Sequence, residues 1–166
     1  MSQAAHSRQA SYREALLEHL FVGAVLRALW LAGPVHAEVL KPQVDDAGYD
    51  IVVESKGILR HIQLKSSFLG AKTASQKIHR RLAEKPGGCV VWIMFDPETL
   101  DLGPFLWFGS PPGEPLPDLR SFKIARHTKG DATGHKALRP MIRVVPKGRF
   151  TRLDTIEDVV GVLFGR

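Results

Sequence analysis

The most constraining feature of the sequence is a run of seven apolar residues, CVVWIMF, at positions 89–95. The run follows a Pro-Gly-Gly stop and is far shorter than the ~20 apolar residues that a membrane-spanning helix needs. A short strand without polar alternation is typical of the centre of a sheet that is covered on both faces. The rest of the chain must therefore supply a layer for each side of a sheet.

Helical patterns are expected to supply these layers. Residues 12–31 carry apolar side chains at helical spacing, after a capping-box start at Ser11 and Glu14. A second capping box predicts a second helix over residues 73–84. A third helix is predicted at the end of the chain, over residues 153–164.

Short apolar segments between the helical patterns are expected to form strands. Besides the run at 89–95, they lie at residues 35–40, 49–55, 58–67, 104–109 and 141–145. Helix, three strands, helix and strand, in this order, is typical of a mixed α/β sandwich around one sheet that helices flank. A chain of 166 residues is expected to form a single domain, here residues 11–166 after a disordered tail at 1–10.

The hairpin after the first strand contains polar residues that suit strands poorly. A turn of two or four residues around Lys56-Gly57 pairs positions whose numbers sum to 113, which predicts Asp50 opposite Gln63. Strand alternation then puts Asp50, Gln63 and Lys65 on one face of the sheet. The apolar residues of both strands share the opposite, core face: Ile51, Val53, Ile62 and Leu64.

A polar cluster of this kind suits metal-assisted hydrolysis of phosphodiester bonds. Carboxylate and amide oxygens can hold Mg²⁺, which prefers oxygen ligands and keeps several waters. The metal lowers the pKa of a bound water and stabilises negative charge on the phosphate. A lysine beside it can orient the attacking water or neutralise the phosphate oxygens.

The order of GYD, a short hairpin and IQLK resembles the PD-(D/E)XK nuclease superfamily, which has the restriction-endonuclease-like fold. It is most similar to the branch in which Gln replaces the first acid of the second motif, as in Mrr-like restriction enzymes. The resemblance covers about residues 12–95. It implies that Asp50 ligates the metal and that Gln63 is the second side-chain ligand. It also implies a catalytic Lys65 and a metal contact from the Leu64 carbonyl.

The same superfamily often places a further acid on the helix before the first strand. Glu14 and Glu18 lie one turn apart on the first helix. We expect Glu18 to contribute, because it lies deeper in the helix, and Glu14 stays open. A helix acid matters here because the neutral Gln63 leaves the site one negative charge short. The chain also departs from the family pattern in having Tyr49 where a proline often precedes the acid.

The charge of the chain is unevenly distributed. The formal net charge is +6, yet residues 120–152 contain ten Lys and Arg against one acid, Asp131. That segment is +9, so the rest of the chain is −3. Such an asymmetry is typical of a surface that binds a polyanion. The basic residues expected to contact nucleic acid are Lys77, Arg80 and Arg81 of the second helix and Arg126, Lys129, Arg139 and Arg143.

These features favour an Mg²⁺-dependent endonuclease, with Mn²⁺ as a substitute metal and DNA rather than RNA as the substrate. The alternative is a nuclease fold that has lost turnover and only binds nucleic acid. A basic protein-interaction domain is a third reading. Many proteins of this fold dimerise to cut both strands, which leaves a homodimer open.

The remaining composition limits the other classes of function. The one cysteine, Cys89, excludes an internal disulfide framework and a multi-cysteine zinc site. The N-terminal residues lack the apolar core of a signal peptide, and no membrane partner is expected. The sequence therefore predicts a cytoplasmic protein.

Overall fold

The computed structural model of the protein describes residues 10–33, 36–44, 47–129, 134 and 136–165. Residues 1–9 of the predicted tail lie outside this description. The described chain begins with helix α2 (Ala10–Leu31) and ends with helix α3 (Ile156–Phe164). Two short 3-10 helices also form, η1 (Arg80–Glu84) and η2 (Lys147–Arg149). The strands are β1 (Ala37–Leu40), β2 (Ile51–Ser55), β3 (Ile58–Phe68), β4 (Ser75–His79), β5 (Gly88–Phe95), β6 (Leu102–Phe108), β7 (Lys123–Arg126), β8 (Leu138–Pro146) and β9 (Thr151–Leu153).

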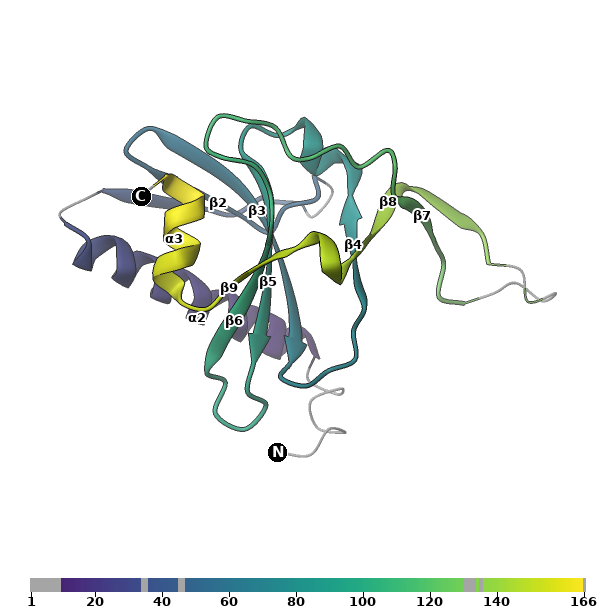
Figure 1. The fold of residues 1–166 in the computed structure, drawn as a ribbon, viewed down its shortest axis with the longest axis horizontal. Helices are drawn as coiled ribbons and strands as arrows, with labels where there is room; N and C mark the ends of the chain where they lie inside the picture. The colour runs from purple at the N-terminus through teal and green to yellow at the C-terminus, as the bar shows by residue number, and fades with distance from the viewer. Residues whose placement is uncertain (1–9, 34–35, 45–46, 130–133, 135, 166) are drawn as a thin grey trace.

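The strands form two sheets (Figure 1). The larger sheet has the order β1-β2-β3-β5-β6-β9, and its only parallel neighbours are β3 and β5. The smaller sheet is antiparallel and has the order β4-β8-β7. This architecture confirms the predicted mixed α/β fold around a mixed sheet, whereas the second, smaller sheet was not predicted.

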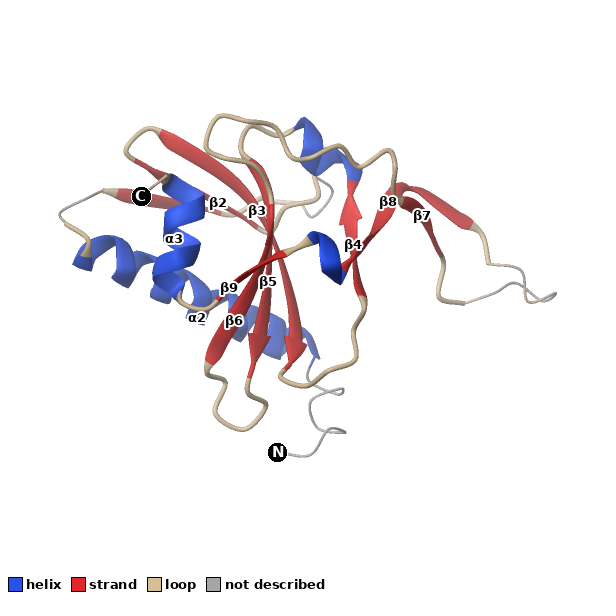
Figure 2. Cartoon of the chain, in the orientation of Figure 1, coloured by secondary structure: helices blue, strands red, loops and turns tan. Residues whose placement is uncertain are grey.

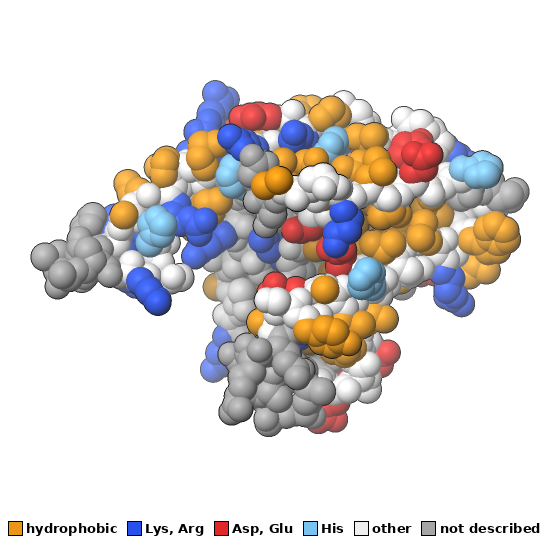
Figure 3. Space-filling model, turned by 180° about the vertical axis from the view of Figure 1, so that it is seen from behind, with side chains coloured by type: hydrophobic (Ala, Val, Ile, Leu, Met, Phe, Trp, Pro, Cys, Tyr) orange, Lys and Arg blue, Asp and Glu red, His pale blue; other side chains and the backbone are white. Residues whose placement is uncertain are grey.

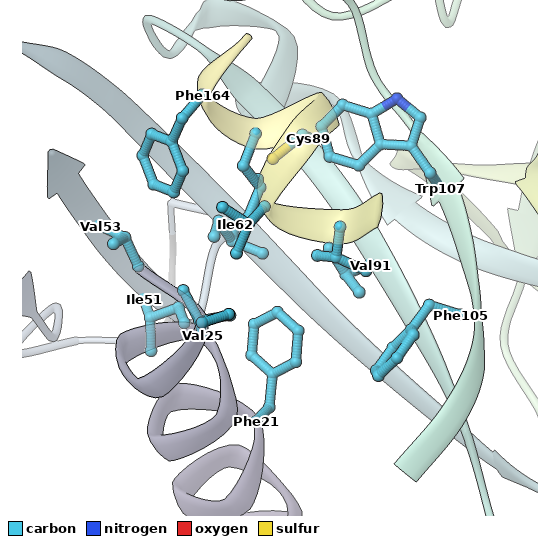
Figure 4. Close-up of a cluster of buried hydrophobic side chains, with 14 of the residues drawn as sticks. Phe21, Val25, Ile51, Val53, Ile62, Cys89, Val91, Phe105, Trp107 and Phe164 are labelled. Carbon is cyan, nitrogen blue, oxygen red and sulfur yellow. The ribbon is translucent and has the colours of Figure 1, made fainter. Parts of the chain in front are cut away.

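Both α-helices cover the same face of the larger sheet (Figure 4). Helix α2 packs Phe21 and Val25 against Ile51 of β2 and Ile62 of β3. Helix α3 adds Phe164 to the same core. The buried stripe of α2 repeats every three to four residues, which is why this helix was readable in the sequence: Leu17, Phe21, Val25, Ala28 and Leu29.

The opposite face of the larger sheet is covered by the smaller sheet and by η1 (Figure 2). Ile78 of β4, Leu82 of η1 and Val145 of β8 pack there around Trp92 of β5. Strand β5 therefore lies between two cores, and all of its residues are buried. This confirms the two-sided cover that the apolar run predicted.

The predicted helix over residues 73–84 is wrong. Residues Ser75–His79 form strand β4, which pairs with β8, and only the 3-10 helix η1 follows. The apolar spacing of Ile78 and Leu82 does fit a helix, but the structure buries one from a strand and the other from η1. Pairing with a strand more than sixty residues away outweighs the local helical pattern here.

The hairpin register is confirmed within the strands. A two-residue turn at Lys56-Gly57 joins β2 to β3, and Ser55 pairs with Ile58. The ladder continues to Ile51 opposite Ile62. Ile51, Val53 and Ile62 are buried in the helix-side core, and Leu64 packs against it.

The helix ends differ in detail from the prediction. Helix α2 already includes Ala10 and Ser11, so Ser11 is not its N-cap. Helix α3 begins at Ile156, later than predicted, and is capped by Thr155, which forms a capping box with Asp158. Among the residues described, no helix has the length and apolar character that crossing a membrane requires.

A buried arginine ties helix α3 to the larger sheet. Arg60 on β3 is 0% exposed, and its guanidinium donates to the carbonyls of Leu163 and Val162 at 2.7 and 2.8 Å. It also donates to the Ser110 carbonyl at 2.9 Å. These bonds satisfy carbonyls at the end of α3 that have no partner within the helix. Burial lowers the pKa of Arg60 and raises that of the nearby Cys89 thiol to about 12.

The distal parts of β7 and β8 form an arm that stands away from the body (Figure 1). We define the arm as residues 123–129 and 136–141. Strand β4 pairs with β8 only from Ile142 to Pro146, so the distal part of β8 has β7 as its neighbour. Residues 130–133 and 135, which include Asp131, lie outside the described residues.

Candidate active site

The candidate site is built where strand β3 runs on beyond the start of β2. Strand β2 begins at Ile51, so the β3 edge after Ile62 is no longer covered by a regular strand. Asp50 occupies this edge, and its carboxylate Oδ2 accepts the backbone N–H of Leu64 at 2.6 Å. A carboxylate is thereby fixed against the strand that carries Gln63 and Lys65.

The Leu64 carbonyl belongs to the same edge. The N–H and C=O of one strand residue point to the same side of the strand. Since the Leu64 N–H points at Asp50, its carbonyl oxygen faces the side on which the Asp50 carboxylate lies. The predicted pair of oxygen donors, Asp50 and Leu64, therefore shares one strand edge.

A hollow of about 540 Å³ opens at this edge, between helix α2 and strands β3 and β4. Asp50, Leu64 and Lys65 line it together. Glu14 and Glu18 of α2 line it from the other side. The hollow thus brings together the predicted acid, the predicted lysine and both candidate helix acids.

The helix acids differ in their surroundings. Glu18 forms an ion pair with Lys41, at 2.5 Å between carboxylate and ammonium, and its side chain is 15% exposed. Glu14 lies one turn earlier and is exposed. The pair with Lys41, which follows β1, was not predicted, because nothing local in the sequence places that residue beside α2. Lys41 offsets the negative charge that Glu18 brings to the hollow.

Gln63 does not pair with Asp50 as predicted. The regular ladder ends at Ile51, and the Asp50 N–H donates to the Ile62 carbonyl at 2.9 Å. Gln63 lies on the same face of β3 as Lys65, opposite the helix-side core. It is 8% exposed, and its Oε1 is buried without a hydrogen-bond partner. It lines a second hollow, of about 640 Å³, that Lys65 also borders. Lys65 is thus the residue that the two hollows share.

Gly48 explains why Asp50 leaves the predicted register. Its φ is +79°, a conformation that favours glycine, and an added Cβ would lie 2.7 Å from the Cβ of His79. The chain before β2 is therefore pressed against strand β4 instead of running along β3. Asp50 comes from this bend with its carboxylate directed at the β3 edge.

The second hollow is basic. Its charged and titratable lining residues are Lys65, Lys77, His79, Arg81 and Arg139. Lys77 and Arg81 come from β4 and η1 instead of the predicted helix, and Arg139 comes from the arm. Side chains from three parts of the sequence thus form one positively charged concave surface beside Lys65.

The other basic residues predicted to bind nucleic acid lie elsewhere. Arg80 lines a separate hollow and lies near Asp118, whose pKa is lowered mainly by its hydrogen bond to Arg120. Arg126 is exposed on the arm, as is Lys129. Arg143 is only 7% exposed and donates to the Pro140 carbonyl at 2.6 Å, so it adds nothing to the exposed charge.

Two further polar residues of the first hollow were missed by the sequence analysis. Gln76 lines it from β4, and Ser66 lines it from β3. Gln76 lies where the sequence predicts the start of a helix, and its place in β4 depends on pairing with β8, which nothing local in the sequence indicates. Ser66 follows Lys65 directly, and no signal in the sequence marks it.

The donor set of the site contains few acids. Within the described residues, no three His, Cys, Asp or Glu side chains lie together as a metal-binding group. The oxygen donors that do meet at the β3 edge, the Asp50 carboxylate and the Leu64 carbonyl, suit a hard cation such as Mg²⁺. The buried Gln63 Oε1 is a third oxygen of the same strand that lacks a partner.

Comparisons with known proteins give a likeness to a solved structure. No family model and no curated protein matches the chain. A solved structure of a bacterial homing endonuclease, I-Ssp6803I, is similar at 25% identity over 68% of this chain and 78% of that one, with a TM-score of 0.31. A TM-score of this size does not establish a shared fold, so the proposals below rest on the residues of this chain.

Proposed function

We propose that this chain is a metal-dependent nuclease of the PD-(D/E)XK type that hydrolyses phosphodiester bonds of DNA. The observation that carries the proposal is the Asp50 carboxylate fixed on the Leu64 N–H, beside Lys65 in one hollow. A neighbouring basic hollow that shares Lys65 supports an anionic polymer as the substrate. The Gln in the second motif supports the Mrr-like branch of that superfamily.

The metal would be held by the Asp50 carboxylate and the Leu64 carbonyl, with Gln63 and a helix acid as further donors. Bound there, Mg²⁺ or Mn²⁺ would stabilise negative charge on the phosphate and lower the pKa of a water. Asp50 keeps its direction through the Leu64 hydrogen bond, so it is oriented before any ligand binds.

Lys65 contributes the positive charge of the protein itself. Its ammonium group would lie against the phosphate oxygens, where it favours the extra negative charge that builds when water attacks phosphorus and the bond to the leaving oxygen breaks. The other cations of the basic hollow would hold the flanking phosphates without taking part in bond breaking.

Supercoiled plasmid DNA incubated with Mg²⁺, Mn²⁺, Ca²⁺ or EDTA tests the proposal. We expect nicked and linear products with Mg²⁺ and Mn²⁺, and none with EDTA. The Lys65→Ala variant, purified in the same way, should remain inactive under all four conditions and so excludes a contaminating nuclease. If the wild-type protein leaves the plasmid intact under all four conditions, the proposal is overturned.

A second candidate is a nuclease fold that binds nucleic acid without turnover. The ion pair between Glu18 and Lys41 favours it, because that pair offsets one of the few acids that could hold a metal. No cluster of three His, Cys, Asp or Glu side chains that could hold a metal forms among the described residues, which points the same way. Tight, salt-dependent DNA binding without metal-dependent cleavage would identify this second function. The homodimer stays a prediction, which sedimentation with and without DNA would test.

A further inference from the structure

We propose that the arm enters the major groove of double-stranded DNA and thereby lays one strand of the duplex against the basic hollow beside Lys65. This inference rests on the proposed function in that it names the substrate of the same site. The described residues of the arm, their exposure and their continuity with the hollow carry it.

Beyond Ala125, which is 1% exposed, every described residue of the arm is exposed, at 126–129 and 136–141. Arg126 pairs with Leu138 on one face, and Ala125 pairs with Arg139 on the other. Leu138 is 52% exposed although it is apolar and lies in strand β8. Arg139 next to it is also exposed. A ribbon that buried one face on the body would not leave both neighbours open to solvent.

The arm carries one sign of charge in its described residues. Its basic side chains are all exposed: Lys123, Arg126, Lys129, Lys136 and Arg139. No acid occurs among the described arm residues. Several Lys and Arg side chains lie along the arm and the adjoining part of the body, at the left of Figure 3. The positively charged side chains of such a ribbon repel one another unless a polyanion neutralises them.

A two-stranded ribbon fits the major groove of B-form DNA in size. The groove is about 12 Å wide and admits a two-stranded β-ribbon. The major groove of an RNA duplex is deep and narrow, so side chains cannot read it. The shape of the arm therefore favours duplex DNA over duplex RNA, and Leu138 offers an apolar contact of the kind that thymine methyl groups accept.

The base of the arm is braced and joined to the basic hollow. The pairing of β7 with β8 shifts between Ile124 and Ala125, where β8 carries the extra residues of a bulge. The buried Arg143 guanidinium donates to the Pro140 carbonyl inside this bulge at 2.6 Å. Arg139, on the arm side of the bulge, and Met141, within it, line the hollow that Lys65 also borders. The arm and the candidate site are thus fixed relative to each other.

Dimethyl sulfate footprinting tests where the arm lies, because the reagent methylates guanine N7 in the major groove and adenine N3 in the minor groove. The probe is a mixed-sequence DNA duplex of about three helical turns, in EDTA so that cleavage plays no part. We expect the wild-type protein to protect guanine N7. The Arg126→Gln/Lys129→Gln variant should lose this protection, and the salt slope of its binding should fall by about 2, at roughly 0.9 for each phosphate contact.

A variant with the same loss of charge away from the arm is the control. Arg27→Gln/Lys56→Gln removes two exposed basic residues, one on α2 and one in the β2–β3 turn, both far from the arm (Figure 1). It should retain guanine N7 protection and most of the salt slope. Duplex RNA and single-stranded DNA should bind more weakly than duplex DNA, and the arm variant should change neither by more than about twofold.

The outcomes separate this inference from the proposed function. Three results would overturn the proposed role of the arm without affecting metal-dependent cleavage. These are unchanged N7 protection in the arm variant, protection of adenine N3 alone, and an equal loss of protection in the control variant. Arm-dependent N7 protection without any cleavage would support major-groove binding by the arm and contradict the proposed nuclease activity. Tighter binding of single-stranded DNA or RNA than of duplex DNA would contradict binding of the arm in the major groove.

Discussion

The carboxylate of Asp50 accepts the backbone N–H of Leu64 at 2.6 Å, although the two residues stand fourteen positions apart on either side of a tight turn. The bond takes the place that a further residue of β2 would occupy in a regular ladder. It fixes a carboxylate at the edge of β3, beside Lys65, which follows Leu64 in the strand and lines the same hollow. The rest of the candidate site depends on this contact.

Asp50→Asn tests whether the charge of this carboxylate is needed. The amide oxygen can still accept the Leu64 N–H, so we expect the free energy of unfolding to change by less than about 1 kcal/mol. Metal-dependent plasmid cleavage should fall by about 100-fold or more, because a neutral amide stabilises a bound cation less. Urea unfolding and plasmid nicking, measured on the same preparation, check both expectations.

Glu54→Gln is the matched control for this change. Glu54 lies in the same hairpin, and its carboxylate also accepts a backbone N–H, that of Gly57, at 2.6 Å. It lines neither hollow of the candidate site. Its variant should cleave at the wild-type rate, and an equal loss of cleavage in both variants would mean that the charge of Asp50 has no special role.

Lys65→Ala should remove turnover with little loss of affinity. The lysine is one of several cations beside the hollows, so DNA binding in EDTA should weaken by no more than about threefold, whereas cleavage should fall by about 100-fold or more. Lys72→Ala, an exposed lysine just after β3, should leave both unchanged. Single-turnover cleavage and filter binding measure the two effects separately. Cleavage by the Lys65 variant at near wild-type rate would end its catalytic assignment.

The hairpin was predictable because its determinants are local. A two-residue turn and strand alternation set the pairing of Ile51 with Ile62, and the structure has that register. The direction of the Asp50 carboxylate was not predictable in the same way. It depends on Gly48 lying against His79, a contact between a loop and a strand about thirty residues later.

Non-local pairing also explains the incorrect second helix. Strand β4 exists because β8 pairs with it, and the sequence of residues 73–84 alone carries a helical spacing of apolar residues. The number of basic residues in the sequence also could not predict which of them are exposed, because exposure depends on non-local packing. That number cannot distinguish Arg139, which faces the basic hollow, from Arg143, whose guanidinium turns inward to the Pro140 carbonyl.

Gly48→Ala should damage both stability and the site. The new Cβ would meet the Cβ of His79 at 2.7 Å in a backbone conformation that alanine disfavours. We expect a loss of about 2 kcal/mol or more in the free energy of unfolding, and a larger loss of cleavage as Asp50 moves. Gly57→Ala is the control, because its φ of +78° is equally disfavoured but no atom lies within 4 Å of the added Cβ.

The difference between the two glycine variants measures the contact with His79. Gly57→Ala should cost only the backbone term of about 1 kcal/mol and leave cleavage intact. Equal destabilisation of the two variants, by urea unfolding, would show that the close approach of Gly48 to β4 does not hold Asp50 in place.

Arg60→Met should be the most destabilising of the substitutions considered. Methionine keeps an apolar stem but leaves the carbonyls of Leu163, Val162 and Ser110, which are buried or partly buried, without the hydrogen bonds that Arg60 donates. A buried acceptor left without its donor typically costs about 1–3 kcal/mol, so the three carbonyls together should cost about 3 kcal/mol or more. Arg152→Met is the control: Arg152 also donates at 2.7 Å, to Asp154, but both side chains are exposed, so its loss should cost less than about 1 kcal/mol. Urea unfolding of both variants decides the point, and a change below about 1 kcal/mol for Arg60→Met would show that α3 does not need this arginine to stay on the sheet.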